Sequence, residues 1–557
     1  MTTPFLHPDL HPDLQPAGEL LYQTFRPGAN AAQWLCRCLA DNGIGHLFLV
    51  PGLQLDPLYA ALDTTEGIEP VVCTHELGAG FMADGYGRSR QLPGVAAAIG
   101  CVGAGNLLNT VTTSRLERQP LLVFTGDVPD TVSGRGFQRA GSYGGHDDEI
   151  FAAAAKFSRR VRSAAELPEL LAEAWRQAIS QPCGPAHLIL SRSLLEAPLA
   201  APLLKMPPAQ KQAFACEARL LKWLQQPGKP VLVAGEELDG PQVPQLLQAV
   251  AERHQLPVAT TLNCKGLLPE THPLSLGNLG YAGSARALGS FSRQRLRALW
   301  LGCSNSNRNL LGIGEAAERS EDLWISSLVQ PGVPRQLQAD PVAALELLAQ
   351  LPLLAGRPPS LPPASWPQPN SVLSTDGALE PAAVITALSQ LWSESLPVFV
   401  DSGTHRLFAG LYWQARRPRQ FLTCNQTAPM GWALAAAIGN CMARPGQPAL
   451  VLSGDGCMLM QGLELRTAVR YGLPLVLVVF QNQGMASFRL RQQPEFSPSL
   501  AGVDFCLLAQ ALGAQACRVE TLQELEPALR QALRQPGPTL LEVQSTRIPW
   551  LPPGAPF

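Results

Sequence analysis

Long apolar runs, an excess of one charge and paired cysteines are all missing from this 557-residue sequence. No stretch of about 18 uninterrupted apolar residues occurs, so we expect no membrane-spanning helix. The formal net charge of −2 gives no support for nucleic acid or a membrane surface as a partner. The 13 cysteines form no Cys-x-x-Cys pair and no Cys/His cluster at metal spacing, which favours reduced thiols in a cytoplasmic protein.

The N-terminus also lacks the pattern of a secretory signal, since no basic segment precedes an apolar core there. We expect residues 1–29 to form a loosely packed N-terminal arm. The remaining composition is globular, with 46% apolar and 15% charged residues. A chain of this length is long enough for about three domains, each with its own core.

Alternating apolar strands and periodic helices predict an α/β protein with three doubly wound parallel-sheet domains. We expect the domains at residues 30–197, 209–351 and 377–557. Residues 352–376 are rich in proline and serine and are predicted to be a linker. Polar or glycine-rich residues follow the predicted strands at 46–50, 69–73, 95–99 and 121–124, where open α/β sheets bind ligands.

The most informative stretch lies in the third domain. One apolar run leads into Ser-Gly-Asp-Gly-Cys at 453–457, and a second leads into Gln-Asn-Gln-Gly at 481–484. Between them, residues 458–471 carry Leu459, Leu463 and Ala468 at helical spacing, which predicts a strand, helix and parallel strand. Asp455 and Asn482 would then meet at the carboxyl edge of the sheet.

A carboxylate, an amide oxygen and a nearby backbone carbonyl suit a hard cation such as Mg²⁺. The glycines of the same stretch let backbone N–H groups approach phosphate oxygens at a helix start. The alternative interpretation is an Asp-Gly turn and a polar loop, both common in α/β proteins.

Gly-Asp-Gly, followed by an Asn at the end of the next strand, resembles the cofactor motif of thiamine-diphosphate enzymes. The stretch His-Glu-Leu-Gly-Ala-Gly-Phe-Met-Ala-Asp-Gly-Tyr-Gly-Arg at 75–88 is similar to the family pattern around its activating glutamate. Val-Pro-Gly at 50–52, Phe-Gln at 137–138, and residues 266–273 and 277–280 also match. Residues 30–545 thus resemble the acetolactate synthase-like group, which implies pyrimidine-binding, central and diphosphate-binding domains in that order.

The resemblance implies that Glu76 hydrogen-bonds N1′ of the cofactor's aminopyrimidine and so promotes loss of the proton at thiazolium C2. Met430 would hold the cofactor bent, and the Ala428 carbonyl would accept from its amino group. A helix-capping Glu and a core Met are the alternatives for these two types of side chain. Further candidates for the catalytic site are Gln138, as a substrate contact, and His405, as a proton relay beside His75 and His146.

The same resemblance implies a set of residues for the cofactor's diphosphate end. Mg²⁺ would be held by Asp455, Asn482 and the carbonyl of Gly484. Other expected cofactor contacts are Pro51, Thr404, His405, Gly454, Gly456, Cys457 and Met485.

Departures from the family concern the second cofactor and the proton relay. Acetolactate synthases that bind FAD carry an Arg-Phe-Asp type stretch after a central-domain strand. Here the sequence is Gly-Cys-Ser-Asn-Ser-Asn-Arg-Asn at 302–309, which makes FAD doubtful. The paired histidines of pyruvate decarboxylase-like enzymes are replaced by Thr-Ser-Arg-Leu-Glu-Arg at 113–118.

The expected function is decarboxylation of a 2-oxo acid with thiamine diphosphate and Mg²⁺, and transfer of the enamine to a second carbonyl. A simple 2-oxo acid decarboxylase or a C–C lyase is the alternative within this chemistry. A cofactor-binding protein without catalysis is a third hypothesis. The resemblance further implies a homodimer or homotetramer in which Glu76 and Asp455 act in one site from different subunits.

Overall fold

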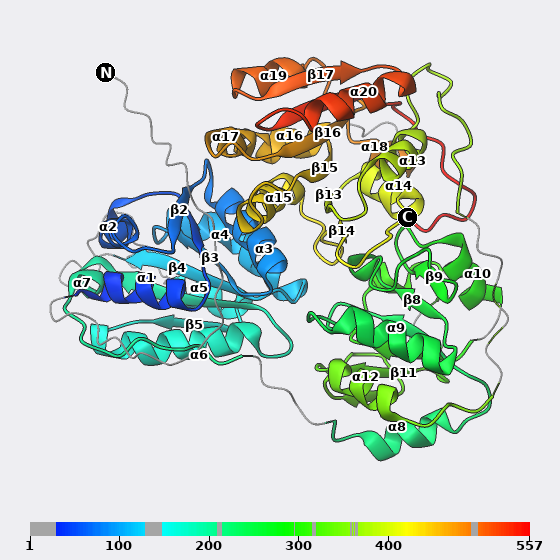
Figure 1. Cartoon of the computed structure of the whole chain (residues 1–557), viewed down its shortest axis with the longest axis horizontal. Helices are drawn as coiled ribbons and strands as arrows, with labels where there is room; N and C mark the ends of the chain where they lie inside the picture. The colour runs from blue at the N-terminus through cyan, green and yellow to red at the C-terminus, as the bar shows by residue number, and fades with distance from the viewer. Residues whose placement is uncertain are drawn as a thin grey trace.

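The computed structural model describes residues 29–127, 147–208, 214–293, 296–314, 319–356, 359, 361, 366–491 and 499–557. These residues form three six-stranded sheets flanked by helices, which confirms the predicted α/β fold of three doubly wound domains. Figure 1 shows the first domain in blue to cyan, the central domain in green and the third in yellow to red. No helix in the described ranges is long and apolar enough to cross a membrane.

The first sheet has the order β2-β1-β3-β4-β6-β5, and its strands are parallel. The order changes direction between β1 and β3, so a crevice is expected beyond their carboxyl ends. The strands are β1 (His46–Leu49), β2 (Glu69–Val72), β3 (Gly94–Ala98), β4 (Leu121–Asp127), β5 (Phe157–Arg160) and β6 (Pro185–Ser191). The helices are α1 (Ala31–Asp41), α2 (Asp56–Leu62), α3 (Glu76–Arg90), α4 (Val102–Leu116), α5 (Asp147–Ala154), α6 (Leu167–Ile179) and α7 (Arg192–Glu196).

The central sheet has the order β12-β11-β10-β7-β8-β9, again parallel. Its direction changes between β7 and β10, which is the strand order of many dinucleotide-binding sheets. The strands are β7 (Val231–Ala234), β8 (Val258–Thr260), β9 (Ser275–Asn278), β10 (Ala298–Leu301), β11 (Leu323–Ser326) and β12 (Gln336–Gln338). The helices are α8 (Glu217–Leu224), α9 (Val243–His254), α10 (Ala285–Arg293), α11 (Asn307–Leu310) and α12 (Pro341–Gln350).

The third sheet, β14-β13-β15-β16-β18-β17, repeats the strand order of the first. The strands are β13 (Val398–Val400), β14 (Phe421–Leu422), β15 (Ala449–Gly454), β16 (Leu475–Gln481), β17 (Gln515–Val519) and β18 (Thr539–Gln544). The helices are α13 (Pro381–Leu391), α14 (Thr404–Tyr412), α15 (Trp432–Ala443), α16 (Asp455–Gln461), α17 (Leu465–Arg470), α18 (Ala486–Leu490), α19 (Phe505–Ala511) and α20 (Leu522–Ala532).

The predicted neighbours β15 and β16 are confirmed as parallel, with Gly454 opposite Phe480. The helix between them differs from the prediction. It begins at Asp455 and is interrupted by a 3₁₀ turn at Gly462–Glu464 before α17. Leu459 and Leu463, which the helical spacing would place on a buried face, are 48% and 60% exposed.

The first and third domains share one apolar core, because α3 packs directly against α15 (Figure 1). Small residues make the close approach possible. A Cβ on Gly85 would lie 2.0 Å from the Ala436 carbonyl oxygen, and one on Gly439 would lie 1.9 Å from that of Met82. Trp432 Nε1 also donates across the contact to Asp84 Oδ2 at 2.7 Å. The two domains that carry the predicted site are therefore held rigidly together within one chain.

Candidate active site

The third sheet changes direction between β13 and β15, and the predicted diphosphate residues lie at this point. Thr404 and His405 open α14 after β13, and Asp455 opens α16 directly after β15. Asn482 follows β16. The chain thus brings these side chains to one edge of the sheet, as the sequence predicted.

Asp455 is buried and faces the backbone of the loop that follows β16. Its Oδ2 accepts from Gly484 N at 3.0 Å, and its Oδ1 accepts from Gly456 N at 2.8 Å. Burial raises the pKa of this carboxyl, although the backbone N–H groups around it act in the opposite direction. Bringing a cation to the carboxylate would offset the cost of its desolvation.

Two buried polar atoms at this edge have no hydrogen-bond partner among the described residues. They are Asn482 Oδ1 and His405 Nε2. Buried polar atoms in native proteins nearly always have partners, so both atoms indicate a place for a ligand. An amide oxygen beside the Asp455 carboxylate fits Mg²⁺, and an imidazole nitrogen fits a phosphate oxygen.

Burial lowers the pKa of His405 to about 3, so its ring is neutral, and the ring stacks on Phe480 at 6.1 Å between centroids. The ring also lies against two glycines. A Cβ on Gly403 would come within 2.5 Å of His405 Cε1, and one on Gly454 within 3.0 Å. These glycines keep the crevice wide enough for the imidazole at its base.

The loop before α15 brings further predicted residues to the same place. Ala428 adopts a left-handed conformation with φ of +51°, which an alanine adopts only at a cost. A Cβ on Gly456 would lie 2.9 Å from Met430 Cε and 3.4 Å from Met485 Cε. Met430, Met485 and Gly456 therefore converge beside Asp455. Cys457 Sγ donates to the Ser402 carbonyl at 3.0 Å, so this thiol connects the ends of β13 and β15.

Asp401 is a residue of this crevice that the sequence did not identify. Its Oδ1 accepts from Gly431 N at 2.9 Å, and its Oδ2 accepts from Ser453 Oγ at 3.2 Å. Burial raises its pKa to about 6. The carboxyl joins the loop after Met430 to the end of β15. In the sequence, its position directly after an apolar strand is the feature that could have identified it as a site residue.

The first domain supplies the second half of the predicted site. Glu76 begins α3 and accepts from Asn106 Nδ2 of α4 at 2.9 Å. A Cβ on Gly103 would lie 3.2 Å from Glu76 Oε1. His75 is exposed and uses Nδ1 to cap the helix at Leu77 N, which is a structural role. Pro51 is exposed just after β1.

A buried carboxylate links the two halves within the chain. Glu464 of the third domain accepts from His75 N at 3.0 Å and from Thr74 N at 3.2 Å, at the start of α3. Thr467 Oγ1 fixes the same carboxylate at 2.7 Å. The stretch from Asp455 to Glu464 thus connects the predicted diphosphate site to the turn that precedes Glu76. Two further predicted residues, Gln138 and His146, lie outside the described residues.

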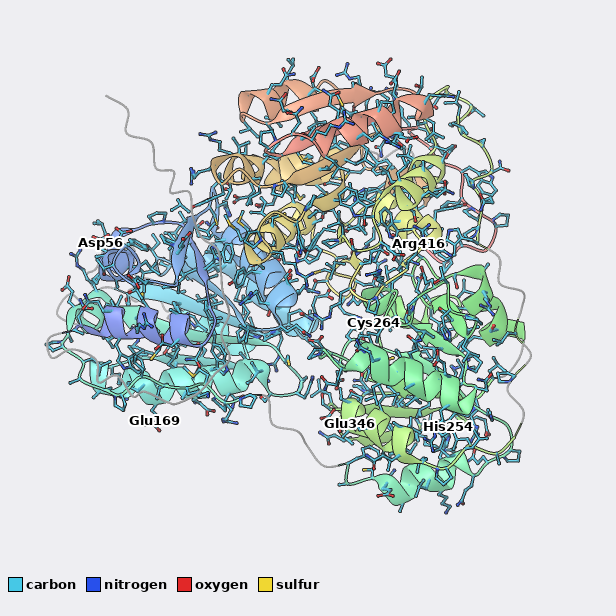
Figure 2. The ribbon with its side chains drawn as sticks, in the orientation of Figure 1. Asp56, Glu169, His254, Cys264, Glu346 and Arg416 are labelled. Atoms are coloured by element: carbon cyan, nitrogen blue, oxygen red, sulfur yellow. The ribbon has the colours of Figure 1, made fainter. Side chains whose placement is uncertain are left out.

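A cavity of about 790 Å³ lies elsewhere, between the three domains. Its lining includes Cys264 and Glu346, which Figure 2 labels at the border of the central domain. Within the described ranges, neither Glu76 nor Asp455 lines it. Its size alone therefore does not identify the active site.

The strand-end crevice, its buried carboxylate and its unpartnered polar atoms define a cofactor-dependent α/β enzyme. Comparison with protein families identifies the cofactor. Residues 29–147 match the N-terminal TPP binding domain of thiamine pyrophosphate enzymes, 218–308 match the central domain, and 401–543 match the C-terminal TPP binding domain. These ranges follow the family's order and together cover more than half of the chain, which belongs to the thiamine pyrophosphate (thiamine diphosphate) enzyme family.

Relatives of similar length extend this result. The chain is 28% identical to the acetolactate synthase isozyme 1 large subunit of Escherichia coli, over 94% of this chain and 96% of the relative. It is 26% identical to the acetolactate synthase large subunit of Lactococcus lactis, over 94% and 95%. Identity to the mitochondrial catalytic subunit of Saccharomyces cerevisiae is 26%, over 94% and 82%. The chain is thus a thiamine diphosphate-dependent enzyme similar to acetolactate synthases.

Proposed function

We propose that this enzyme uses thiamine diphosphate and Mg²⁺ to decarboxylate a 2-oxo acid and to transfer the remaining acyl unit to a second carbonyl. The observation that carries the site is the unpartnered Asn482 Oδ1 beside buried Asp455. The reaction is proposed from the relatives named acetolactate synthases.

Thiamine diphosphate, when bound, supplies a thiazolium carbon that adds to a carbonyl and accepts the electrons left by departing CO₂. The chain's own residues bind and orient it. Asp455, Asn482 and the carbonyl of Gly484 would hold Mg²⁺ and with it the diphosphate. His405, kept neutral by burial, would contact a phosphate oxygen through Nε2.

Glu76 would hold a proton at N1′ of the aminopyrimidine. The Asn106 amide donates to its Oε2 at 2.9 Å and fixes the direction of the carboxylate. Met430 would keep the cofactor bent, and the left-handed Ala428 would turn its carbonyl to the amino group. Asp401 restrains this loop through Gly431 N.

A second copy of the chain completes the site in this proposal. Exposed apolar side chains occur in the segments of both halves: Leu459, Met460 and Leu463 follow Asp455 in the chain, Leu53 follows β1, and Val102 begins α4. Exposed fractions of 56% for Val102 and 72% for Leu53 are high for apolar residues, and such patches mark interfaces. A symmetric dimer would bring each patch against the other and would cover both half-sites.

The role of Glu76 is tested with Glu76→Gln. Proton exchange at C2 of the bound cofactor should fall by about 100-fold or more, since general acid–base groups contribute of this order. Cofactor affinity should change little. Glu69→Gln, an exposed carboxylate in β2, is the control. Exchange at the parent rate in Glu76→Gln would remove Glu76 from this role.

The shared site is tested by mixing inactive Glu76→Gln with inactive Asp455→Ala protein. If each site combines Glu76 of one copy with Asp455 of the other, random reassociation of symmetric dimers restores about a quarter of the sites. Recovered activity therefore supports the dimeric site. No recovery, with subunit exchange verified by mass, would place both residues in one chain.

The reaction itself is tested with a panel of 2-oxo acids and identification of products by mass. Acetolactate from pyruvate supports the proposal. Acetaldehyde as the sole product would instead assign simple decarboxylation. No CO₂ from any 2-oxo acid, with the cofactor bound, would reject both.

A further inference from the structure

At the point where the strand order of the central sheet changes direction, buried side chains of this chain occupy the crevice, beside the cavity described above. The crevice lies beyond β7 and β10, where sheets of this strand order bind dinucleotides. Such sheets usually place glycines after the first strand so that a diphosphate can approach the backbone. Here β7 is followed by Gly235, Glu236 and Glu237, and both carboxylates are buried in the crevice.

Both carboxylates are fully engaged in hydrogen bonds. Glu237 pairs with Arg118 of the first domain and accepts from Ser326 Oγ at 2.5 Å and Ser327 N at 2.8 Å. Glu236 Oε2 accepts from Ser304 N at 3.2 Å.

Glu236 Oε1 accepts from two amides. They are Asn309 Nδ2 and, from the third domain, Gln426 Nε2, each at 2.9 Å. A dinucleotide diphosphate would meet two negative charges there and would have to displace these bonds. The residues present therefore do not fit FAD.

A third carboxylate extends this network to the backbone of the third domain. Glu117, at the end of α4, is 1% exposed. Its Oε1 accepts from Gln426 N at 2.8 Å and from Thr427 N at 3.1 Å, while its Oε2 accepts from Asn263 Nδ2 at 2.7 Å. Asn263 Oδ1 in turn accepts from Asn425 N at 3.0 Å.

The segment held in this way leads straight into the proposed cofactor loop. Thr427 is followed by Ala428, whose φ of +51° is costly for alanine, and then by Met430. Without outside restraint a loop in this conformation would relax, because no side-chain preference favours it. Three N–H groups of residues 425–427 are instead fixed by side chains of the first and central domains.

We infer that Glu117, Glu236 and Glu237, with Arg118, form a clamp between the three domains that positions the Ala428–Met430 loop. The clamp occupies the point after β7 where the diphosphate of a dinucleotide would lie, so we expect no FAD to bind there. Glu117 is thus a positioning residue, and its effect on the cofactor rests on the proposed function above.

The clamp is tested with Glu117→Ala and with Glu117→Gln, which keeps one acceptor for the loop. The matched control is Asp322→Asn. Among the described residues, the buried carboxylate of Asp322 bonds only within the central domain, to Ala298 N, Trp300 Nε1 and Arg319 Nε. If Glu117→Ala fails to fold, Glu117→Gln supplies the same measurements at a smaller amplitude.

Two readouts separate the clamp from the cofactor assignment. The first is hydrogen–deuterium exchange of the peptide 424–431 in cofactor-free protein. Its amides at 426 and 427 should exchange at least about tenfold faster in Glu117→Ala and remain unchanged in Asp322→Asn. The second is proton exchange at C2 with saturating thiamine diphosphate, which should fall about tenfold in Glu117→Ala, less in Glu117→Gln, and not in the control.

Each result decides a different statement. Unchanged amide exchange in both Glu117 variants would overturn the clamp. Faster amide exchange with parent-like C2 exchange would overturn its positioning role. A parent protein that binds no thiamine diphosphate would refute the proposed function, while the amide measurement would still decide the clamp.

Binding of FAD is tested separately. Dialysis of the purified parent protein against FAD should leave no flavin absorbance with the protein. Stoichiometric retention of flavin would overturn the inference that the clamp excludes a dinucleotide.

Discussion

The crevices of the third and central sheets differ in how completely the polar side chains that follow their strands are hydrogen-bonded. Both lie where the strand order changes direction, between β13 and β15 in one and between β7 and β10 in the other. In the third sheet, Asn482 Oδ1 and His405 Nε2 are buried without partners among the described residues. In the central sheet, every oxygen of Glu236 and Glu237 accepts a hydrogen bond, and the atoms there without partners in the described ranges, Asn309 Oδ1 and Ser327 Oγ, belong to residues that already bond these carboxylates.

The strand order alone therefore does not decide whether a crevice binds a ligand. The backbone creates a crevice at both places, but the side chains after the strands decide whether a ligand can enter. In the third crevice, the amide oxygen of Asn482 and the imidazole of His405 face the site without a partner among the described residues. In the central crevice, a buried and fully bonded carboxylate has become a structural contact.

Removing Asp455 should have the largest effect on cofactor binding, because it removes the charge that makes the third crevice a cation site. We expect Asp455→Ala to weaken binding of thiamine diphosphate with Mg²⁺ by about 100-fold or more, measured by titration calorimetry. Asp504→Ala is the control, since Asp504 is a carboxylate of the same domain that pairs with Arg518 near the surface. Parent-like affinity in Asp455→Ala would mean that the third crevice is not the diphosphate site.

Breaking the ion pair of the central crevice should have the largest effect on stability. Arg118 is 8% exposed at its side chain and Glu237 is 0% exposed. Glu237→Leu leaves the Arg118 charge buried and unpaired, which costs about 3–5 kcal/mol in the free energy of unfolding. Thermal and urea unfolding measure this loss.

The double variant Arg118→Leu/Glu237→Leu sharpens the comparison. It removes both charges and should recover about 2 kcal/mol or more relative to Glu237→Leu, because an apolar replacement of a buried pair is often near neutral. Glu526→Leu, which breaks an exposed pair with Arg530, should shift stability by about 0.5 kcal/mol or less. A double variant no more stable than the single one would mean that Glu237 acts mainly through Ser326 and Ser327.

The third crevice was largely predictable from sequence because its parts are local. Gly454 and Asp455 follow one strand, Asn482 follows its neighbour, and a single strand–helix–strand unit brings them together. Gln481, the last residue of β16, also shapes this loop. Its side chain donates to the Val503 carbonyl at 3.0 Å and accepts from Gln483 N at 3.1 Å.

The central crevice could not be predicted, because its bonds join residues far apart in the chain. Glu117 and Gln426 meet only after the first and third domains have docked, and no local pattern indicates their contact. The same limit applies to Leu459 and Leu463. Helical spacing indicates which face is apolar but cannot say that this face lies on the surface of a single chain.

The smallest expected effect is on how the free energy of unfolding of the cofactor-free protein depends on pH. Two titratable groups of the third crevice determine it. Burial lowers the pKa of His405 from its usual 6.5 to about 3. Between these values the unfolded chain binds more protons, so the free energy of unfolding rises as pH rises. Burial raises the pKa of Asp401 from 3.8 to about 6, and there the folded state binds more protons, so stability falls as pH rises.

The two groups therefore oppose each other between about pH 4 and 6, and removing one should uncover the other. Relative to the parent, Asp401→Asn should gain a positive slope of stability with pH, of at most about 1.4 kcal/mol per pH unit. His405→Gln should gain a negative slope of similar size. Thermal unfolding midpoints across this range measure both slopes. Parent-like pH dependence in both variants would mean that water or ions reach these groups in the empty crevice and relieve the desolvation that shifts their pKa values.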